Sequence, residues 1–127
     1  MYIIGMGSEI VECLRIAQVI ERHGEQFIAR VFTTHEIDYC SGQAAATQHY
    51  AACWAAKEAI LKALGTGWKP GTAWQDIEIH HTKSGHRKVT LRGAARDLLE
   101  RSGIVKIHIS TSHCRTYAIA YVIVEGD

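Results

Sequence analysis

Two charged side chains and two glycines stand out in the segment WAAKEAILKALGTG, residues 54–67. Glu58 and Lys62 lie four residues apart with the glutamate on the N-terminal side, which is the favoured orientation for an ion pair on a helix surface. Gly65 and Gly67 are typical of a helix end followed by a turn. Considered alone, these residues favour a stable helix with a glycine stop.

A different chemistry follows if Glu58 lies close to Glu9, which comes shortly after the strand-like residues 2–6. Two carboxylates that face one cavity repel each other unless a cation lies between them. Proteins usually hold Mg²⁺ with one or two carboxylates together with substrate phosphates. Lys62 and the backbone N–H groups of the glycines that follow it would then be placed to hold a diphosphate. The simpler alternative for Glu9 is a carboxylate that favours the N-terminus of a helix.

A third polar group occurs near the C-terminus, where His113 ends the segment HISTSH and Ser110 lies close to it in the sequence. A single histidine in a turn is usually only polar, so this pattern does not by itself predict a site. Core packing is the default role of Trp54, and Cys53 is most simply a small buried apolar residue.

The periodicity of apolar residues predicts the elements that carry these groups. Residues 2–6 should form a short buried strand, and Ser8 should cap a helix that ends at Gly24. One or two short helices follow over residues 25–40, and Thr34 is expected to cap the second of them.

The longest helix is expected from Ala44 to Leu64, where the glycines stop it. Two hairpin strands, a helix and two final strands should follow, over residues 76–80 and 87–91, 93–103, and 106–113 and 116–125. The last strand is apolar on both faces, so we expect it at the centre of its sheet. The order predicts a single α+β domain over residues 1–127, with an antiparallel or mixed sheet, a long central helix and helices packed on one side.

Composition limits the range of functions. The chain has 14 Lys and Arg residues and 13 Asp and Glu residues, so its formal net charge of +1 gives no overall attraction to nucleic acid or to a membrane surface. The first residues lack a signal-peptide pattern, and the apolar runs are too short for a membrane span. Four scattered cysteines without CxxC spacing therefore lead us to expect reduced thiols in a cytoplasmic protein rather than a zinc site.

Taken together, four segments resemble the holo-acyl-carrier-protein synthases, the short trimeric bacterial type of phosphopantetheinyl transferase. WAAKEAILKALGTG is similar to that family's signature helix, aromatic-x-x-Lys-Glu-Ala-x-x-Lys-Ala-x-Gly-x-Gly, and IIGMGSEIVECLRI resembles its opening, Gly-x-Gly-x-Asp-Ile-Val-Glu-x-x-Arg-Ile. GTAWQDIEI and HISTSHCRTYAIAYVIVE are similar to its third and fourth blocks. The resemblance runs in order from about Tyr2 to Glu125.

The resemblance implies an enzyme that moves the phosphopantetheine arm of coenzyme A onto a serine of an acyl carrier protein, releases adenosine 3',5'-bisphosphate and requires Mg²⁺, with Mn²⁺ as an alternative. It also implies a homotrimer whose sites are shared between neighbouring subunits. By position, Glu9 and Glu58 correspond to metal ligands, Lys62, Gly65, Gly67, Ser110 and His113 to the coenzyme A site, and Arg15 and Arg22 to the helix that meets the carrier. Glu58 and Lys62 are the catalytic candidates, with Glu58 as the acceptor of the serine proton.

Two positions depart from the family pattern. Glu9 stands where the family has aspartate, and its extra methylene moves the carboxylate by about one C–C bond, which octahedral Mg²⁺ does not absorb freely. Cys53 stands where the family usually has arginine, so a fixed cation is lost there. An active enzyme is still expected, because Glu58, Lys62 and His113 are all present.

Two alternatives remain open at this point. The changes at Glu9 and Cys53 are compatible with a non-catalytic relative that binds coenzyme A or a carrier protein without transfer. An α+β interaction domain in which every charge is solvated is the third reading, and it predicts that Glu58 contributes only a few tenths of a kcal/mol through its helix pair.

Overall fold

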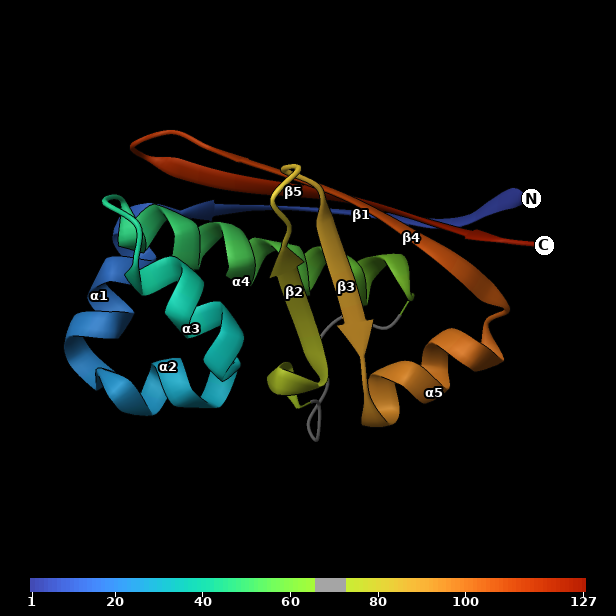
Figure 1. The fold of residues 1–127 in the computed structure, drawn as a ribbon, viewed down its shortest axis with the longest axis horizontal. Helices are drawn as coiled ribbons and strands as arrows, with labels where there is room; N and C mark the ends of the chain where they lie inside the picture. Colours follow the sequence, from blue (N-terminus) through green and yellow to red (C-terminus); the bar gives the residue numbers. More distant parts are fainter. Residues whose placement is uncertain (66–72) are drawn as a thin grey trace.

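The computed structural model describes residues 1–65 and 73–127. Within these residues, one strand is followed by four helices, and the other four strands and the last helix lie in the second half of the chain (Figure 1). In chain order the elements are β1 (Tyr2–Glu12), α1 (Cys13–His23), α2 (Glu25–Val31), α3 (Thr34–Ser41), α4 (Ala46–Ala63), a 3₁₀ turn η1 (Trp74–Asp76), β2 (Ile77–His81), β3 (Arg87–Leu91), α5 (Gly93–Arg101), β4 (Ile104–His113) and β5 (Tyr117–Gly126).

The strands form two antiparallel sheets. The larger sheet has the order β1–β5–β4, so the last strand lies at its centre as expected from its apolar sequence. Glu9 on β1 pairs with Ala120 on β5, which pairs in turn with Thr111 on β4. Strands β2 and β3 form a separate hairpin. The predicted α+β class is confirmed.

Helix α4 lies across one face of the larger sheet, and the β2–β3 hairpin crosses the helix on its other side (Figure 1). The central strand directs Ala118, Ala120, Val122 and Val124 into the core beneath the helix, and all four are buried. The other face of the sheet has no helix over it in Figure 1. No helix in the described part of the chain has the length and apolar character needed to cross a membrane.

Helix α4 and strand β1 are in direct backbone contact. A Cβ atom added at Gly7 would lie 2.0 Å from the carbonyl oxygen of Ala59, and one added at Gly5 would lie 2.3 Å from the carbonyl oxygen of Ala63. Real Cβ atoms do not approach other atoms so closely, and only glycine fits at these two positions. The alanines on the facing side of α4 complete the contact by leaving no side chain long enough to hold the two elements apart.

The first strand is longer than predicted, and this changes the place of Ser8 and Glu9. We expected a helix capped by Ser8, but β1 continues to Glu12 because its backbone pairs with β5 up to Tyr117. Helix α1 begins at Cys13, whose N–H donates to the carbonyl of Thr116 at 2.8 Å, and no side chain caps it. Glu9 is therefore a strand residue, and it cannot act on a helix dipole as the simpler alternative proposed.

Two other helix boundaries were tested by the structure. Gly24 ends α1 with φ of 55°, as predicted. The cap of α3 is Thr33 and not Thr34, because the Thr33 hydroxyl accepts from the N–H of Glu36 while the Glu36 carboxylate accepts from the N–H of Thr33. This reciprocal pair is a capping box.

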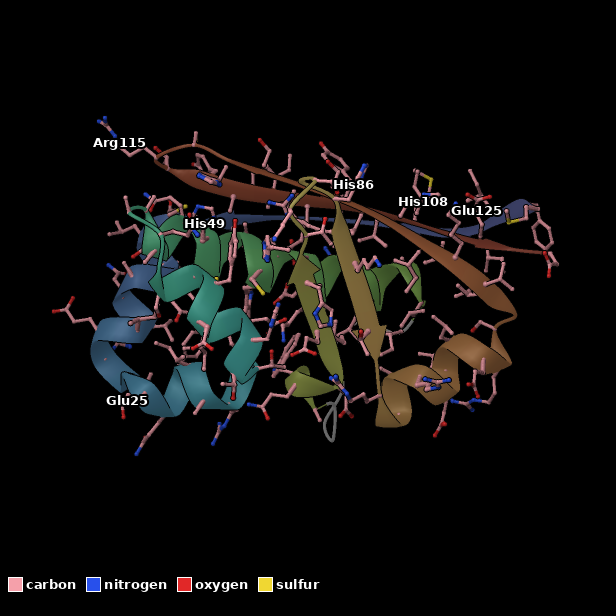
Figure 2. The ribbon with its side chains drawn as sticks, viewed as in Figure 1. Glu25, His49, His86, His108, Arg115 and Glu125 are labelled. Carbon is pink, nitrogen blue, oxygen red and sulfur yellow. The ribbon has the colours of Figure 1, made fainter. Side chains whose placement is uncertain are left out.

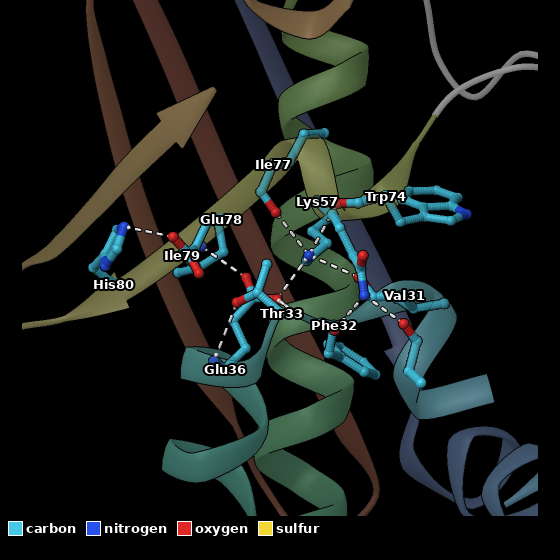
Figure 3. A network of polar contacts seen from close by, with 12 residues as sticks. Val31, Phe32, Thr33, Glu36, Lys57, Trp74, Ile77, Glu78, Ile79 and His80 are labelled. Carbon is cyan, nitrogen blue, oxygen red and sulfur yellow. Dashed lines mark hydrogen bonds and ion pairs between the residues drawn. The ribbon is translucent and has the colours of Figure 1, made fainter. Parts of the chain in front are cut away.

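A fully buried ion pair joins α4 to α3 (Figure 3). Lys57 Nζ lies 2.8 Å from Glu36 Oε1, and both side chains are 0% exposed. The ammonium also donates to the carbonyls of Val31 at 2.9 Å, Ile77 at 2.7 Å and Trp74 at 3.1 Å. Buried charges persist only where such hydrogen bonds replace their lost hydration. Lys57 therefore ties the end of α2, the turn η1 and the start of β2 to the long helix.

The contact between Gly7 and α4 yields the first prediction. Gly7→Ala should lower the free energy of unfolding by about 2 kcal/mol or more, because the new methyl group overlaps a helix carbonyl that cannot move aside alone. Denaturant unfolding of both proteins measures the change. Ser8→Ala is the matched control on the same strand, since Ser8 is exposed, and a loss for Gly7→Ala no larger than for this control would contradict the close contact.

Candidate active site

Glu9 and Glu58 face each other across the contact between β1 and α4. Alternation along β1 places Glu9 on the same face as Gly5 and Gly7, towards the helix. Glu58 lies one residue before Ala59, whose carbonyl meets Gly7. The two carboxyl groups are close enough for each to shift the pKa of the other.

The two carboxyl groups differ in acidity because of their surroundings. Burial and the neighbouring Glu9 carboxylate raise the pKa of Glu58 to about 7. The hydrogen bond from Glu58 is the main cause that lowers the pKa of Glu9, and Lys62 adds to it. Near neutral pH Glu58 is therefore close to losing its proton, and a positive ion between the two carboxylates would favour that loss.

Lys62 reaches back from α4 to the edge strand. Its Nζ atom lies 3.4 Å from Glu9 Oε1 and 3.1 Å from the carbonyl oxygen of Ser8. The helix-surface ion pair with Glu58 that the spacing suggested is replaced by this contact with Glu9. The Lys62 side chain is 50% exposed, so its charge remains available to an anion that approaches from solvent.

A cleft of about 540 Å³ opens beside the carboxylates. Glu9, Glu12 and Glu58 give it an acidic side, and Arg15 contributes one cation. The remaining wall is mainly apolar and comes from Ile10, Val11, Ile16, Val19, Phe27, Trp54 and Tyr117. Such a cleft suits a ligand with a charged group at one end and a less polar body.

The donor set fits a hard divalent cation. Within the described residues, no group of three or more His, Cys, Asp or Glu side chains converges on one point, so protein ligands would number two and would be Glu9 and Glu58. Two carboxylates leave room for the waters and phosphate oxygens that complete the shell of Mg²⁺. The raised pKa of Glu58 shows that a second negative charge beside Glu9 is disfavoured unless a positive charge lies near it.

The glycines after α4 were predicted to end the helix and to line the phosphate side of the site. Gly65 has φ of 83°, and its N–H donates to the carbonyl of Lys62 at 2.9 Å. A Cβ at this position would meet no atom within 4 Å, so the left-handed backbone conformation and not a lack of space favours glycine here. Gly67 lies outside the described residues.

Ser110 and His113 are not next to the carboxylate pair within one chain. Both lie on β4, which is separated from β1 by the whole of β5, a distance of about 10 Å between strand axes. They also point to opposite faces of the sheet, because they are three residues apart on a strand. Ser110 is exposed and borders a hollow of about 320 Å³ whose lining includes His86, Arg87 and His108. His86 and His108 are labelled in Figure 2.

His113 lies on the helix face of the sheet and contacts His49 near the start of α4. The two ring centroids are 4.8 Å apart in an edge-to-face arrangement. His49 precedes Glu58 by nine residues, which is about 13 Å along the helix. His113 is therefore remote from Glu58 as well as from Glu9 in a single subunit.

The two arginines assigned to carrier binding both lie on α1, and both are exposed. They are seven residues apart, close to two helical turns, and so share one side of the helix. Arg15 also borders the cleft that contains Glu9 and Glu58. The helix thus connects the cleft to a surface where a second protein has access.

Sequence reasoning did not identify the role of Lys57, the residue directly before Glu58. Its side chain points away from the cleft into the buried pair with Glu36. Sequence reasoning also gave no reason for Gly5 and Gly7 in the motif IIGMG. Their contact with α4 explains why glycine occurs at both positions. Cys53 is buried next to this network, as predicted, so its thiol makes no contact with the cleft.

A second prediction concerns His81, whose ring stacks on Tyr39 with centroids 3.6 Å apart. Its Nδ1 atom is buried and has no hydrogen-bond partner among the described residues. Burial, followed by the charge of Arg87, lowers the pKa of His81 to about 4. Between pH 4 and the ordinary value near 6.5, the unfolded chain binds a proton that the folded chain excludes, so stability should fall as the pH drops through this range.

We expect this histidine to remove about 1–2 kcal/mol of stability between pH 7 and pH 4.5, less than full linkage because the ring is partly exposed. Urea unfolding of wild type and His81→Phe at both pH values measures it, and phenylalanine keeps the stack on Tyr39. The variant should lose less stability than wild type on acidification. Identical pH dependence in the two proteins would show that His81 binds its proton equally well when folded.

Comparison with known proteins identifies the family. Residues 5–122 match the family model of the 4'-phosphopantetheinyl transferase superfamily. The holo-[acyl-carrier-protein] synthase of Rhodopirellula baltica is 50% identical over 123 residues, covering 97% of this chain and 98% of the relative.

The fold leads to the same group. The crystal structure of holo-[acyl-carrier-protein] synthase from Neisseria meningitidis superposes with a TM-score of 0.88 at 30% identity, covering 98% of this chain and 99% of the other. The Helicobacter pylori holo-[acyl-carrier-protein] synthase, solved in complex with coenzyme A, has a TM-score of 0.82 at 28% identity and covers 94% and 99% of the two chains. The protein therefore belongs to the 4'-phosphopantetheinyl transferase superfamily and, within it, to the holo-[acyl-carrier-protein] synthase family.

Proposed function

We infer that the protein transfers the 4'-phosphopantetheine group from coenzyme A to a serine of an apo acyl carrier protein, releasing adenosine 3',5'-bisphosphate. The observation that carries this proposal is the facing pair Glu9 and Glu58, with Lys62 beside it at the edge of a cleft. Membership of the family and the coenzyme A complexes of relatives support the choice of substrate. The reaction would serve fatty-acid biosynthesis, with a carrier protein as the acceptor.

The carboxylates would bind Mg²⁺, or Mn²⁺ in its place. Such a cation neutralises the negative charge that builds on the diphosphate during transfer. Lys62 would bind the same diphosphate, because its half-exposed ammonium already lies beside Glu9. The backbone at Gly65 and Gly67 would approach the phosphates closely, as glycine permits. Positioning and electrostatic stabilisation then supply most of the rate.

The serine hydroxyl of the carrier must lose a proton as it attacks the β-phosphorus in line. Glu58 would accept that proton, directly or through water, since its carboxyl group lies in the cleft where the serine must enter. Its partner Glu9 stays ionised and keeps negative charge in the site for the cation.

The carrier protein would dock on α1. Arg15 and Arg22 present two exposed positive charges there, and Arg15 borders the cleft. Complementary charges of this kind mainly raise the rate of encounter and select the partner. An acidic helix of the carrier would thereby bring its serine to the carboxylate pair.

A homotrimer would complete the site. The open face of the sheet, defined by Met6, Ile10 and Tyr121, carries large apolar side chains that are 57–67% exposed. A patch of this kind marks a protein contact surface. In such an assembly Ser110 and His113 would serve the carboxylates of a neighbouring subunit, because they lie too far from Glu9 and Glu58 within one chain. We further propose that this assembly works in the cytoplasm with its four cysteines reduced, as they are in the structure.

The main test weighs an apo acyl carrier protein by intact mass spectrometry after incubation with coenzyme A and Mg²⁺. Wild type should add the mass of one phosphopantetheine group. Glu58→Gln and Lys62→Ala should fold normally and lower turnover by about a hundredfold or more, because each removes charge from the transition state. No mass gain with wild type under Mg²⁺ or Mn²⁺ would favour the binding-only relative, for which the replacement at Glu9 is the motivating observation.

A further prediction concerns the length of the Glu9 side chain. Glu9→Asp should keep or raise Mg²⁺ affinity, because a shorter carboxylate withdraws from Lys62 and from the N–H of Ile10, which lies 3.2 Å from Glu9 Oε1. Isothermal titration of both proteins with MgCl₂ measures the affinity. Weaker binding by the aspartate variant would mean that the site has readjusted around glutamate.

A further inference from the structure

The turn between β4 and β5 is attached to the start of α4 at two neighbouring positions. Gln48 Nε2 donates to the carbonyl oxygen of Arg115 at 3.2 Å. The ring of His49, the next residue of the helix, lies edge-on to the ring of His113, with centroids 4.8 Å apart and an interplanar angle of 66°. Figure 2 labels His49 on α4 and Arg115 at the turn. The helix therefore contacts both the backbone of the turn and the histidine beside it.

The ring of His49 is also held by α3. The ring of Tyr39 on α3 lies edge-to-face with it at 5.6 Å between centroids. Tyr39 stacks in turn on His81 of β2, with centroids 3.6 Å apart. The row of rings thus runs from β2 through α3 and α4 to β4. Each such pair stabilises its own geometry beyond the area that it buries, so the partly buried His49 ring has a fixed place in the row.

His113 needs such a contact because its own strand gives it little support. It is the last residue of β4, its side chain is exposed, and β4 is an edge strand of the larger sheet. An exposed side chain in this place can turn among several rotamers unless a neighbour selects one. The edge-to-face contact with His49 makes that selection, since only some rotamers keep the two rings together.

We propose that His49 is a positioning residue that holds the ring of His113 in the orientation in which it contacts coenzyme A. This role rests on the proposed function, since it needs His113 to belong to the coenzyme A site of a neighbouring subunit. A side chain that is already ordered binds a ligand more tightly, because the cost of ordering it is not paid on binding. Phenylalanine would serve in place of His49, because the ring and not its nitrogens makes the contact.

The test measures coenzyme A binding by isothermal titration. His49→Ala removes the ring, and we expect about fivefold weaker binding, the fold-change that corresponds to the loss of one ring pair. His49→Phe is the matched control, because it loses the same ring nitrogens and keeps the ring, so its affinity should stay close to that of wild type. In the transfer assay His49→Ala should raise the KM for coenzyme A and leave kcat nearly unchanged. Thermal melting checks that both variants are folded at the assay temperature.

A double-mutant cycle with His113→Ala shows whether His49 acts through His113. His113→Ala should itself weaken coenzyme A binding, and adding His49→Ala to it should cause no further loss. An equal loss from His49→Ala with and without His113 would overturn the positioning role. Equal affinities of His49→Ala and His49→Phe would overturn it as well, because the ring would then make no difference.

The remaining outcomes separate this role from the proposed function. If wild type binds coenzyme A and His113→Ala binds it equally well, His113 does not contact the ligand, and the role of His49 is overturned while the transferase proposal stands. Failure of wild type itself to bind coenzyme A would overturn the proposed function and the role of His49 together.

Discussion

The contact between the backbones of β1 and α4 sets the geometry on which the site depends. Gly5 and Gly7 allow the helix carbonyls of Ala63 and Ala59 to lie directly against the strand. A side chain at either glycine would push the two elements apart, and Glu9 and Glu58 project from the same two surfaces. The distance between the carboxylates is therefore fixed by residues that have no chemistry of their own. The glycines of the motif serve this packing, while the functional groups lie beside them.

A second constraint acts from the opposite side of the helix. The pair Lys57–Glu36 has no exposed surface and binds backbone carbonyls from three separate elements. A buried pair of this kind costs desolvation energy, and replacing it by apolar residues is often neutral for stability. Its main effect here is positional, because it fixes the rotation of α4 about its axis. The neighbouring Glu58 then faces the cleft, since adjacent helical residues point about 100° apart.

Much of this fold could be predicted from periodicity and glycines, and the site could be predicted only in part. The long helix was expected over residues 44–64 and found over Ala46–Ala63, because its alanine content and its glycine stop are strong local signals. The extension of β1 to Glu12 depends on pairing with β5, more than a hundred residues away, which no local pattern reports. The family resemblance predicted that Glu9 and Glu58 lie together. It did not predict the contact between Lys62 and Glu9, which depends on the spacing between the strand and the helix. The burial of Lys57 has the same origin, since its partner lies 21 residues earlier in the chain.

The close packing of β1 against α4 also determines how the site accommodates Glu9, whose side chain is one methylene longer than the aspartate of the family pattern. Because β1 and α4 are already in backbone contact at Gly5 and Gly7, they cannot move closer, and the extra methylene must be absorbed by the side chain itself. Glu9 Oε1 accepts from the N–H of Ile10 at 3.2 Å and lies 3.4 Å from Lys62 Nζ. The carboxylate is thus bent back along its own strand towards the lysine, and a cation entering the site competes with Lys62 for it. A diphosphate that draws Lys62 away would release this oxygen, so in the proposed reaction the two ligands favour each other's binding.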